Sequence, residues 1–167
     1  TGAALTGMNL ARLNLAESIL SRADLSSADL TNADLEDADL TNADLSGADL
    51  KNADLTSAKL SGVTLSRVDL SGADLEDRNL SGADLTDAIF IGADLSSADL
   101  THADLSRADL TDADLEEASM QGAVLTGVML QNTNLSKVNL TGAALAGMNL
   151  ARLNLAGAFL SGANLSG

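Results

Sequence analysis

The sequence predicts an all-β protein, a parallel β-helix whose coils have four sides. Three observations lead to this prediction. Leu occupies every fifth position from Leu5 to Leu165, with only Phe90 and Met120 as exceptions. The chain has no Pro, which would interrupt a hydrogen-bonded ladder. It also has two Phe and no Tyr or Trp, so its core must be built from small, uniform units.

A period of five fits neither a single α-helix nor a continuous strand. Five helical steps rotate successive Leu by about 140°, so no apolar stripe forms. In a strand, five steps move the side chain to the opposite face, so half of the Leu would face water. A strand of three residues followed by a two-residue corner does fit. The Leu, and the Ala that precedes it by two positions in 22 of 33 units, then point inward. The residue between them, Asp in 15 units, points outward.

The second corner position carries the residues that a type II turn needs. All 14 Gly of the chain lie there, and Gly, Asn or Asp together fill 22 of the 34 positions. A type II turn has a positive φ at this position, which these residues tolerate best. Arg12, Arg22, Ser57 and Glu117 occupy the same position, and we interpret them as corners of type I.

Closure into four sides requires about 90° at each corner, which gives coils of 20 residues. Closure is an assumption at this point. One observation supports it: residues 1–27 and 141–167 are identical at 20 of 27 positions, and their offset of 140 is a multiple of 20.

The repeated unit, as in Ala43-Asp44-Leu45-Ser46-Gly47, resembles the pentapeptide-repeat family over the whole chain. The resemblance implies a right-handed quadrilateral parallel β-helix of about eight coils. It also implies a quasi-one-dimensional array in which each coil contacts only its neighbours. We therefore expect a single domain over residues 1–167, and the duplicated terminal segments suggest that it is a fragment of a longer protein. Some bacterial members of this family resemble DNA and inhibit DNA gyrase.

The charge restricts the class of partner. A formal net charge of −15 argues against direct binding to nucleic acid or to an anionic membrane, and it favours a protein partner with a basic surface. No apolar run approaches the length of a membrane span, and we expect a cytoplasmic protein. The chain has no Cys, and nothing in the sequence indicates a cofactor or a metal site built from thiolates.

With 20 residues per coil, outward residues form four vertical columns. One column stacks five carboxylates about 4.8 Å apart, flanked by Asn at both ends. Its acidic members are Asp34, Asp54, Asp74, Asp94 and Asp114. A solvated face that keeps the rod soluble is the simplest interpretation. DNA mimicry is a second one, because −15 over about 40 Å is within a factor of two of the charge density of duplex DNA. Weak binding of divalent cations is a third.

Departures from the repeat mark candidate contacts. Arg78 takes an inward position normally held by Ala, so we expect its side chain to reach out to solvent or to widen the coil as a contact point. Ile89, Phe90 and Ile91 form an apolar run, and Phe159 is an outward aromatic. These four residues are candidate protein contacts. We also expect a homodimer or end-to-end association through a terminal coil, involving Phe159 and Leu160.

Catalysis is not expected, because a convex rod with a filled core has no concave, dry site. The only His, His102, lies at a corner without a second His or a Cys near it in the repeat. The sequence thus predicts a non-catalytic scaffold with a rigid acidic surface for protein contact. The alternative is a DNA-mimicking regulator of a DNA-binding enzyme such as DNA gyrase.

Overall fold

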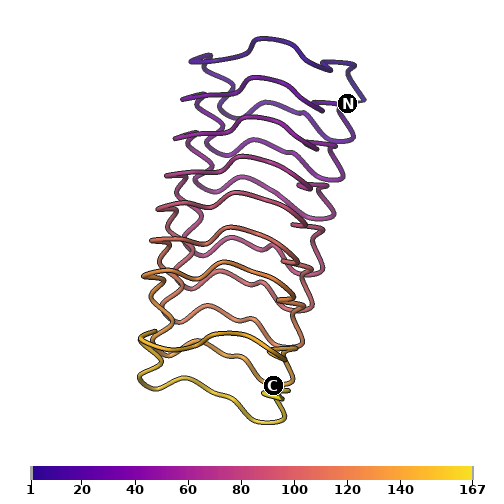
Figure 1. Ribbon diagram of the computed structural model, residues 1–167. Helices are drawn as coiled ribbons and strands as arrows, with labels where there is room; N and C mark the ends of the chain where they lie inside the picture. Colours follow the sequence, from indigo (N-terminus) through magenta and orange to yellow (C-terminus); the bar gives the residue numbers. More distant parts are fainter. Residues whose placement is uncertain (1, 167) are drawn as a thin grey trace.

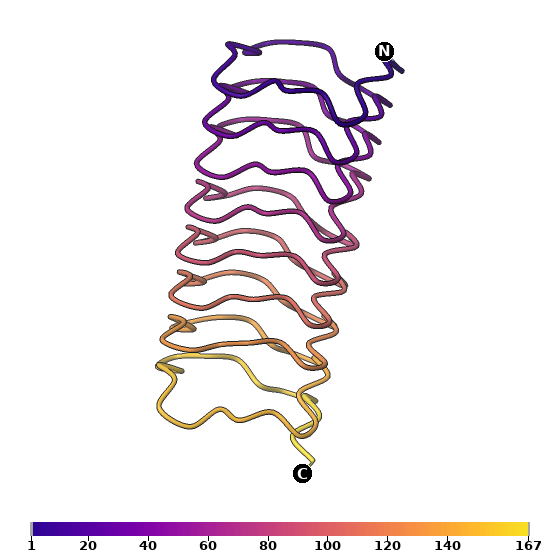
Figure 2. The same ribbon diagram turned by 45° about the horizontal axis from the view of Figure 1, so that its top comes forward.

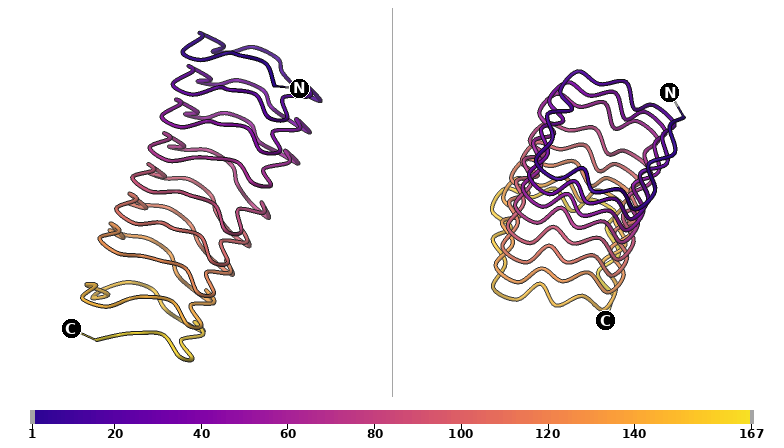
Figure 3. Two further views of the ribbon diagram at one scale, coloured as in Figure 1. Left: turned by 90° about the vertical axis from the view of Figure 1, so that its right-hand side faces the viewer. Right: turned by 90° about the horizontal axis from the view of Figure 1, so that it is seen from above.

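The computed structural model describes residues 2–166 as one stack of four-sided coils. Every β-bridge is parallel and joins residues 20 apart, from Ala4 with Asp24 to Ala144 with Asn164. The two chain ends lie at opposite ends of the stack (Figures 1 and 2), and the view along the axis shows the four sides (Figure 3). No helix and no strand longer than a single bridge occurs within these residues. The predicted closure with 20 residues per coil is confirmed.

Each corner is closed by a backbone hydrogen bond within its own turn, and the same corner recurs in the next coil. The carbonyl of Leu5 accepts a hydrogen bond from the backbone N–H of Met8 (3.1 Å), and the same bond recurs at every corner up to Ala163. The N–H of Gly7, at the second corner position, donates to the carbonyl of Ser26 in the next coil (2.8 Å). Because the corner bond recurs in every unit, all corners keep one conformation.

The type I corners predicted at Arg12, Arg22, Ser57 and Glu117 are therefore wrong. Their φ angles are 60°, 60°, 56° and 62°, in the left-handed region. A side chain other than Gly costs about 1–2 kcal/mol in this conformation. Ladder bonds from the N–H groups of Arg12, Arg22 and Glu117 offset that cost. Over residues 2–166, Ser57 makes no ladder bond to the next coil, and its corner is closed by the bond from Ala58 to Leu55 (3.0 Å).

The core is a narrow tube of inward Leu and Ala. From Ala23 to Ala123 nearly every inward residue is buried, including Phe90 and Met120, which replace Leu at the centre. Burying each Leu contributes roughly 1.5–3 kcal/mol. Toward the two ends the inward residues are more exposed, and Met8 and Leu13 in the first coil are nearly half exposed.

The ladder between coils is interrupted at two places, which we call seams. Seam one lies between residues 53–64 and 73–84. Among residues 2–166, no ladder bond from Leu55, Ser57, Leu60 or Gly62 reaches the next coil, and Lys59 makes no bridge to Asn79. Arg78 lies at the centre of this seam. The ladder on its other side is intact, because Asp99 donates to the carbonyl of Arg78 (2.9 Å).

Seam two lies between residues 125–134 and 144–154. The described part of the chain shows no ladder bond from the N–H of Leu130 or Asn149 and no bridge between Met129 and Asn149. Here large inward residues stack directly on each other, 20 residues apart: Val128 over Met148, and Thr133 over Leu153.

A large inward residue opens a seam only when its stacked neighbour is also large, except for Arg78. Val68 lies between Ala48 and Ala88, and its ladder is intact on both sides. Two large side chains in one inner column exceed the space between coils about 4.8 Å apart, so the coils separate. Arg78 opens a seam against Ala58 alone, because a guanidinium is too large and too polar for the tube.

The two seams open on opposite sides of the rod. Seam one is centred on Lys59 and seam two on Met129, and these outward columns are ten residues apart in a coil of 20. Opposite each opening the ladder is intact: Leu70 donates to Ile89 (2.7 Å) at seam one, and Leu140 donates to Phe159 (2.8 Å) at seam two. Each seam is therefore a wedge that is closed along one side.

Candidate functional site

The predicted acidic column forms as a continuous row, which we call the Asp34 column. Bridges connect Asn14 through Asp34, Asp54, Asp74, Asp94 and Asp114 to Asn134 and Asn154. Each Asp uses its Oδ1 atom to accept the backbone N–H two residues later, at 2.9–3.1 Å. Within residues 2–166, none of their Oδ2 atoms accepts a hydrogen bond from a protein group. The column thus holds its carboxylates in one orientation with one oxygen available.

Corner Thr residues keep the carboxylates of Asp54 in this column, and of Asp29 and Asp39 in other columns, ionised. The pKa of Asp54 lies below its usual value because the side chain and the backbone N–H of Thr56 donate to it. Thr31 and Thr41 lower the pKa of Asp29 and Asp39 in the same way. In these three units the Thr after the central Leu therefore stabilises the charged form of the Asp that precedes it.

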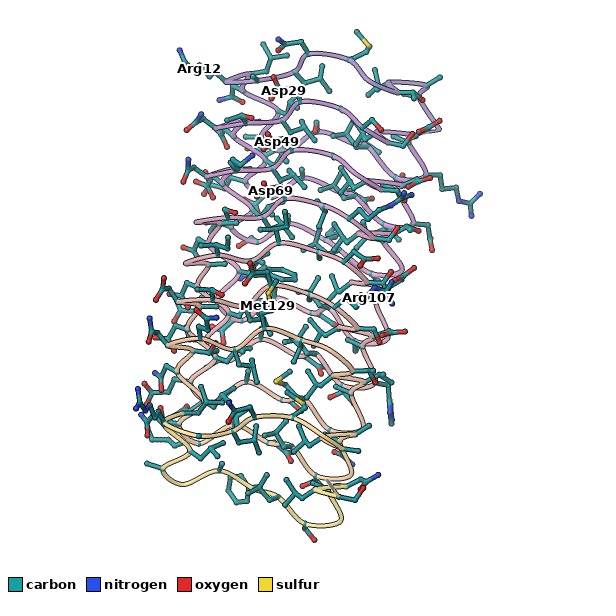
Figure 4. The ribbon with its side chains drawn as sticks, in the orientation of Figure 1. Arg12, Asp29, Asp49, Asp69, Arg107 and Met129 are labelled. Carbon is teal, nitrogen blue, oxygen red and sulfur yellow. The ribbon has the colours of Figure 1, made fainter. Side chains whose placement is uncertain are left out.

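The neighbouring Asp29 column differs from the Asp34 column because apolar residues interrupt it and because Lys51 forms ion pairs with two of its Asp. It consists of Asn9, Asp29, Asp49, Asp69, Ile89, Asp109, Met129 and Asn149. Figure 4 shows Asp29, Asp49, Asp69 and Met129 in one line along the rod. Lys51 forms ion pairs with Asp49 (3.0 Å) and Asp69 (2.8 Å). Burial acts to raise the pKa of Asp69, but the Lys51 and Ser71 hydrogen bonds outweigh it and lower the pKa overall.

The acid is confined to the middle of the rod. Residues 23–120 contain 23 of the 24 acidic residues and five of the nine basic ones, so their net charge is 5 − 23 = −18. Lys137 and Arg152 are the only charged residues in the segment 121–167, which gives it a net charge of +2. Lys137 is paired with Glu116 (2.9 Å) and Glu117 (2.8 Å), and Arg107 pairs with Asp87 through two bonds of 2.7 Å.

The predicted apolar contacts do not form one surface. Phe90 is fully buried, so its assignment as a contact is wrong: it occupies the central, inward position of its unit. Ile89 is half-buried, Ile91 is 42% exposed and Phe159 is 61% exposed. Ile89 and Phe159 lie in columns on opposite sides of the rod, so no single flat partner surface can contact both.

Arg78 turns toward solvent and the coil beside it is widened, whereas its role as a contact point stays a prediction. Its side chain is half-buried, and its Nε atom donates to the carbonyl of Glu76 at 2.8 Å, so the guanidinium turns toward the corner rather than into the core. The coils also separate beside it. The resulting cleft of about 370 Å³ is lined by residues that include Lys59, Leu60 and Asn79.

The pattern of single repeats does not predict the cleft at seam two. This cleft has a volume of about 370 Å³, and its lining includes Val128, Met129, Met148 and Leu153. The inward members of this set look like ordinary core substitutions when each repeat is considered alone. Comparing inward residues 20 apart would have revealed that large ones stack there.

Two other expectations bear on chemistry. Within residues 2–166, no group of three or more His, Cys, Asp or Glu side chains is arranged to hold a metal ion, so the cation-binding hypothesis gains no support. His102 lies at an exposed corner. No helix in the described part of the chain is long and apolar enough to cross a membrane.

Comparisons with known proteins agree with this geometry. The model of the family described as pentapeptide repeats matches segments that together span residues 1–167. The chain is 38% identical to HetL of the cyanobacterium Nostoc, a protein involved in the regulation of heterocyst differentiation. The match has a TM-score of 0.91 and covers 97% of this chain and 74% of HetL.

A trypsin-treated form of QnrB1, a plasmid-mediated fluoroquinolone resistance protein, is 20% identical with a TM-score of 0.62. The match covers 99% of this chain and 92% of QnrB1, and this likeness shows the fold alone. A search among curated proteins found no significant match.

Proposed function

The chain belongs to the pentapeptide-repeat family, and we propose that it is a non-catalytic scaffold that binds a partner protein through its acidic surface. The observation that carries this proposal is the Asp34 column. Five carboxylates are held in one orientation by their own corners, each with an Oδ2 atom that no described protein group occupies. A partner with a row of Lys or Arg side chains would find these acceptors already ordered, which lowers the entropic cost of binding.

The likeness to HetL supports a regulatory role for such contact. HetL is involved in the regulation of heterocyst differentiation. A rigid rod presents its surface to a partner protein without reorganisation, which suits a regulatory contact. The net charge of −18 over residues 23–120 would also accelerate association with a basic partner at low ionic strength.

A pair of charge-matched variants tests the proposal. One variant changes Asp34, Asp54, Asp74, Asp94 and Asp114 to Asn. The control changes five Asp of other columns to Asn: Asp24, Asp44, Asp84, Asp99 and Asp104. Partners are identified by crosslinking and mass spectrometry, and their affinities are then measured with purified proteins. We expect the first variant alone to lose at least tenfold in affinity, since several charge-assisted contacts disappear. Equal losses of affinity in both variants would show that the column acts only through its contribution to the overall negative charge.

A second candidate function is regulation of a DNA-binding enzyme by DNA mimicry. Residues 23–120 form about five coils, or roughly 24 Å of rod. Their net charge of −18 corresponds to one charge per roughly 1.3 Å, against one per roughly 1.7 Å in duplex DNA. Charge density of this order would let the middle of the rod occupy a DNA-binding groove.

The DNA-mimic candidate predicts inhibition of DNA gyrase supercoiling that weakens as salt rises. The five-Asp variant of the Asp34 column should lose this inhibition, whereas its charge-matched control should retain most of it. No inhibition by the wild-type protein at high micromolar concentration would reject gyrase as the target.

A further inference from the structure

Seam two contains a cleft with apolar side chains from both coils, in which some main-chain N–H groups of the described chain have no partner in the neighbouring coil. The cleft, of about 370 Å³, is lined by Val128, Met129, Leu130, Met148 and Leu153 together with polar residues at its mouth. Met129 is 46% exposed, and the Val128, Met148 and Leu153 side chains are partly buried. Among the described residues, the N–H groups of Leu130 and Asn149 have no acceptor in the neighbouring coil.

The large side chains themselves do not require an opening. Met8 and Leu13 are the counterparts of Met148 and Leu153 in the near-identical first coil. Stacked on Ala28 and Ala33, they leave the ladder complete: Asp29 donates to the carbonyl of Met8 and Asp34 to that of Leu13, each at 2.9 Å. The cleft therefore depends on Val128 and Thr133, which take the place of Ala on the facing coil.

The charges around the cleft are asymmetric. On the side of the acidic middle, Asp109 is bridged to Met129, and Asp112 accepts a hydrogen bond from Asn132 at 3.0 Å. Neither carboxylate forms an ion pair within residues 2–166. On the opposite wall lies Arg152. An occupant that matches this pattern has an apolar side chain for the cleft and a cation on one flank only, toward Asp109 and Asp112.

We propose that seam two is the anchor pocket for a partner protein, and that it receives an apolar side chain of Leu or Met size followed by Lys or Arg. This proposal rests on the proposed function, because it places the apolar anchor of the scaffold's contact at the border of the acidic region. A buried apolar anchor beside a polar rim is the usual distribution of energy in protein interfaces. The intact opposite side, where Leu140 donates to Phe159 (2.8 Å), would let the wedge adjust its width without unstacking the coil.

The four Met residues provide a direct test by NMR. The full chain, labelled with ¹³C at its methionine methyl groups, is titrated with a capped peptide of one Leu followed by three Lys. A second peptide has Ala in place of the Leu. We expect the Leu peptide to shift the signals of Met129 and Met148 but not those of Met8 and the buried Met120. The Ala peptide should bind about tenfold more weakly at this pocket.

The double variant Val128→Ala with Thr133→Ala should restore the ladder and abolish the shifts, while circular dichroism confirms its fold. Equal binding of both peptides without shifts at Met129 and Met148 would overturn the pocket but support the acidic scaffold. Absence of binding by either peptide would contradict both proposals. Equal shifts at Met8 and Met148 would assign the effect to exposed Met in general and also reject the pocket.

Discussion

Two pairs of coils, both with mainly Leu at their centres, differ in nearly everything else. Residues 81–100 stack on 101–120 with Ala over Ala at all four inward positions, and each ladder bond from Leu85 to Leu100 is present. Residues 121–140 stack on 141–160 with Val over Met and Thr over Leu, and the ladder opens along one side. The central Leu residues therefore form the tube. The other inward residue of each unit, two positions before the Leu, determines how closely neighbouring coils approach.

The surfaces of the two pairs differ as well. The first pair lies in the acidic middle, and its outward positions carry six Asp. The second pair has no acidic residue, and Asn takes the place of Asp in the Asp34 column, at Asn134 and Asn154. Asn134 donates to Asp114 (3.0 Å) and Asn154 to Asn134 (3.2 Å), so an amide row continues the carboxylate row without adding charge. The regular pair thus combines tight stacking with repulsion between carboxylates, and the open pair has neither.

The largest contrast should come from truncating the central Leu in each region. Leu105 is fully buried in an intact coil, so Leu105→Ala should lower the free energy of unfolding by about 2–5 kcal/mol. Leu150 is only half-buried beside seam two, so Leu150→Ala should cost about 1 kcal/mol. Urea unfolding followed by circular dichroism measures both. Similar losses would show that the open pair is packed as tightly as the regular one.

A new seam should be creatable in the regular region. Ala108 lies between Ala88 and Val128 in its inner column, so Ala108→Met places Met directly on Val128. We expect overpacking to cost about 1–3 kcal/mol and to expose the amide of Met129 to hydrogen exchange. Ala103→Met is the matched control, because Ala83 and Ala123 flank it. If both variants exchange alike, stacking of large residues does not explain the seams.

Closing seam two should change exchange more than stability. In the double variant Val128→Ala with Thr133→Ala, lost apolar burial and regained ladder bonds oppose each other. Each regained bond contributes about 0.5–1.5 kcal/mol, which corresponds to roughly two- to tenfold slower exchange at Leu130 and Asn149. Hydrogen exchange followed by NMR gives these rates. Unchanged rates would indicate that Met148 and Leu153 hold the seam open by themselves.

Acid should distinguish the acidic middle of the rod, residues 23–120, from seam two, and this effect should be the smallest of the four. The folded pKa values of Asp29, Asp39 and Asp54 lie below their usual values, so these groups stabilise the fold above pH 4. That stability is lost as pH falls through the lower, folded pKa. No Asp or Glu occurs after Glu117, so protection factors at seam two should stay constant between pH 5 and pH 3 while those around Asp54 decrease. A parallel decrease in both regions would point to global unfolding instead.

The sequence alone determined the repeating unit, the inward Leu and Ala, and the outward Asp, because each five-residue unit encodes its own strand and corner through local preferences. The vertical order of the columns also followed, once closure at 20 residues was assumed. Only the tertiary structure decided which neighbours meet. The left-handed corners at Arg12 and Glu117, the burial of Phe90 and the two seams all depend on residues of adjacent coils. Those contacts exist only after the chain has closed its square, and the closing angle is a property of the whole stack rather than of one repeat.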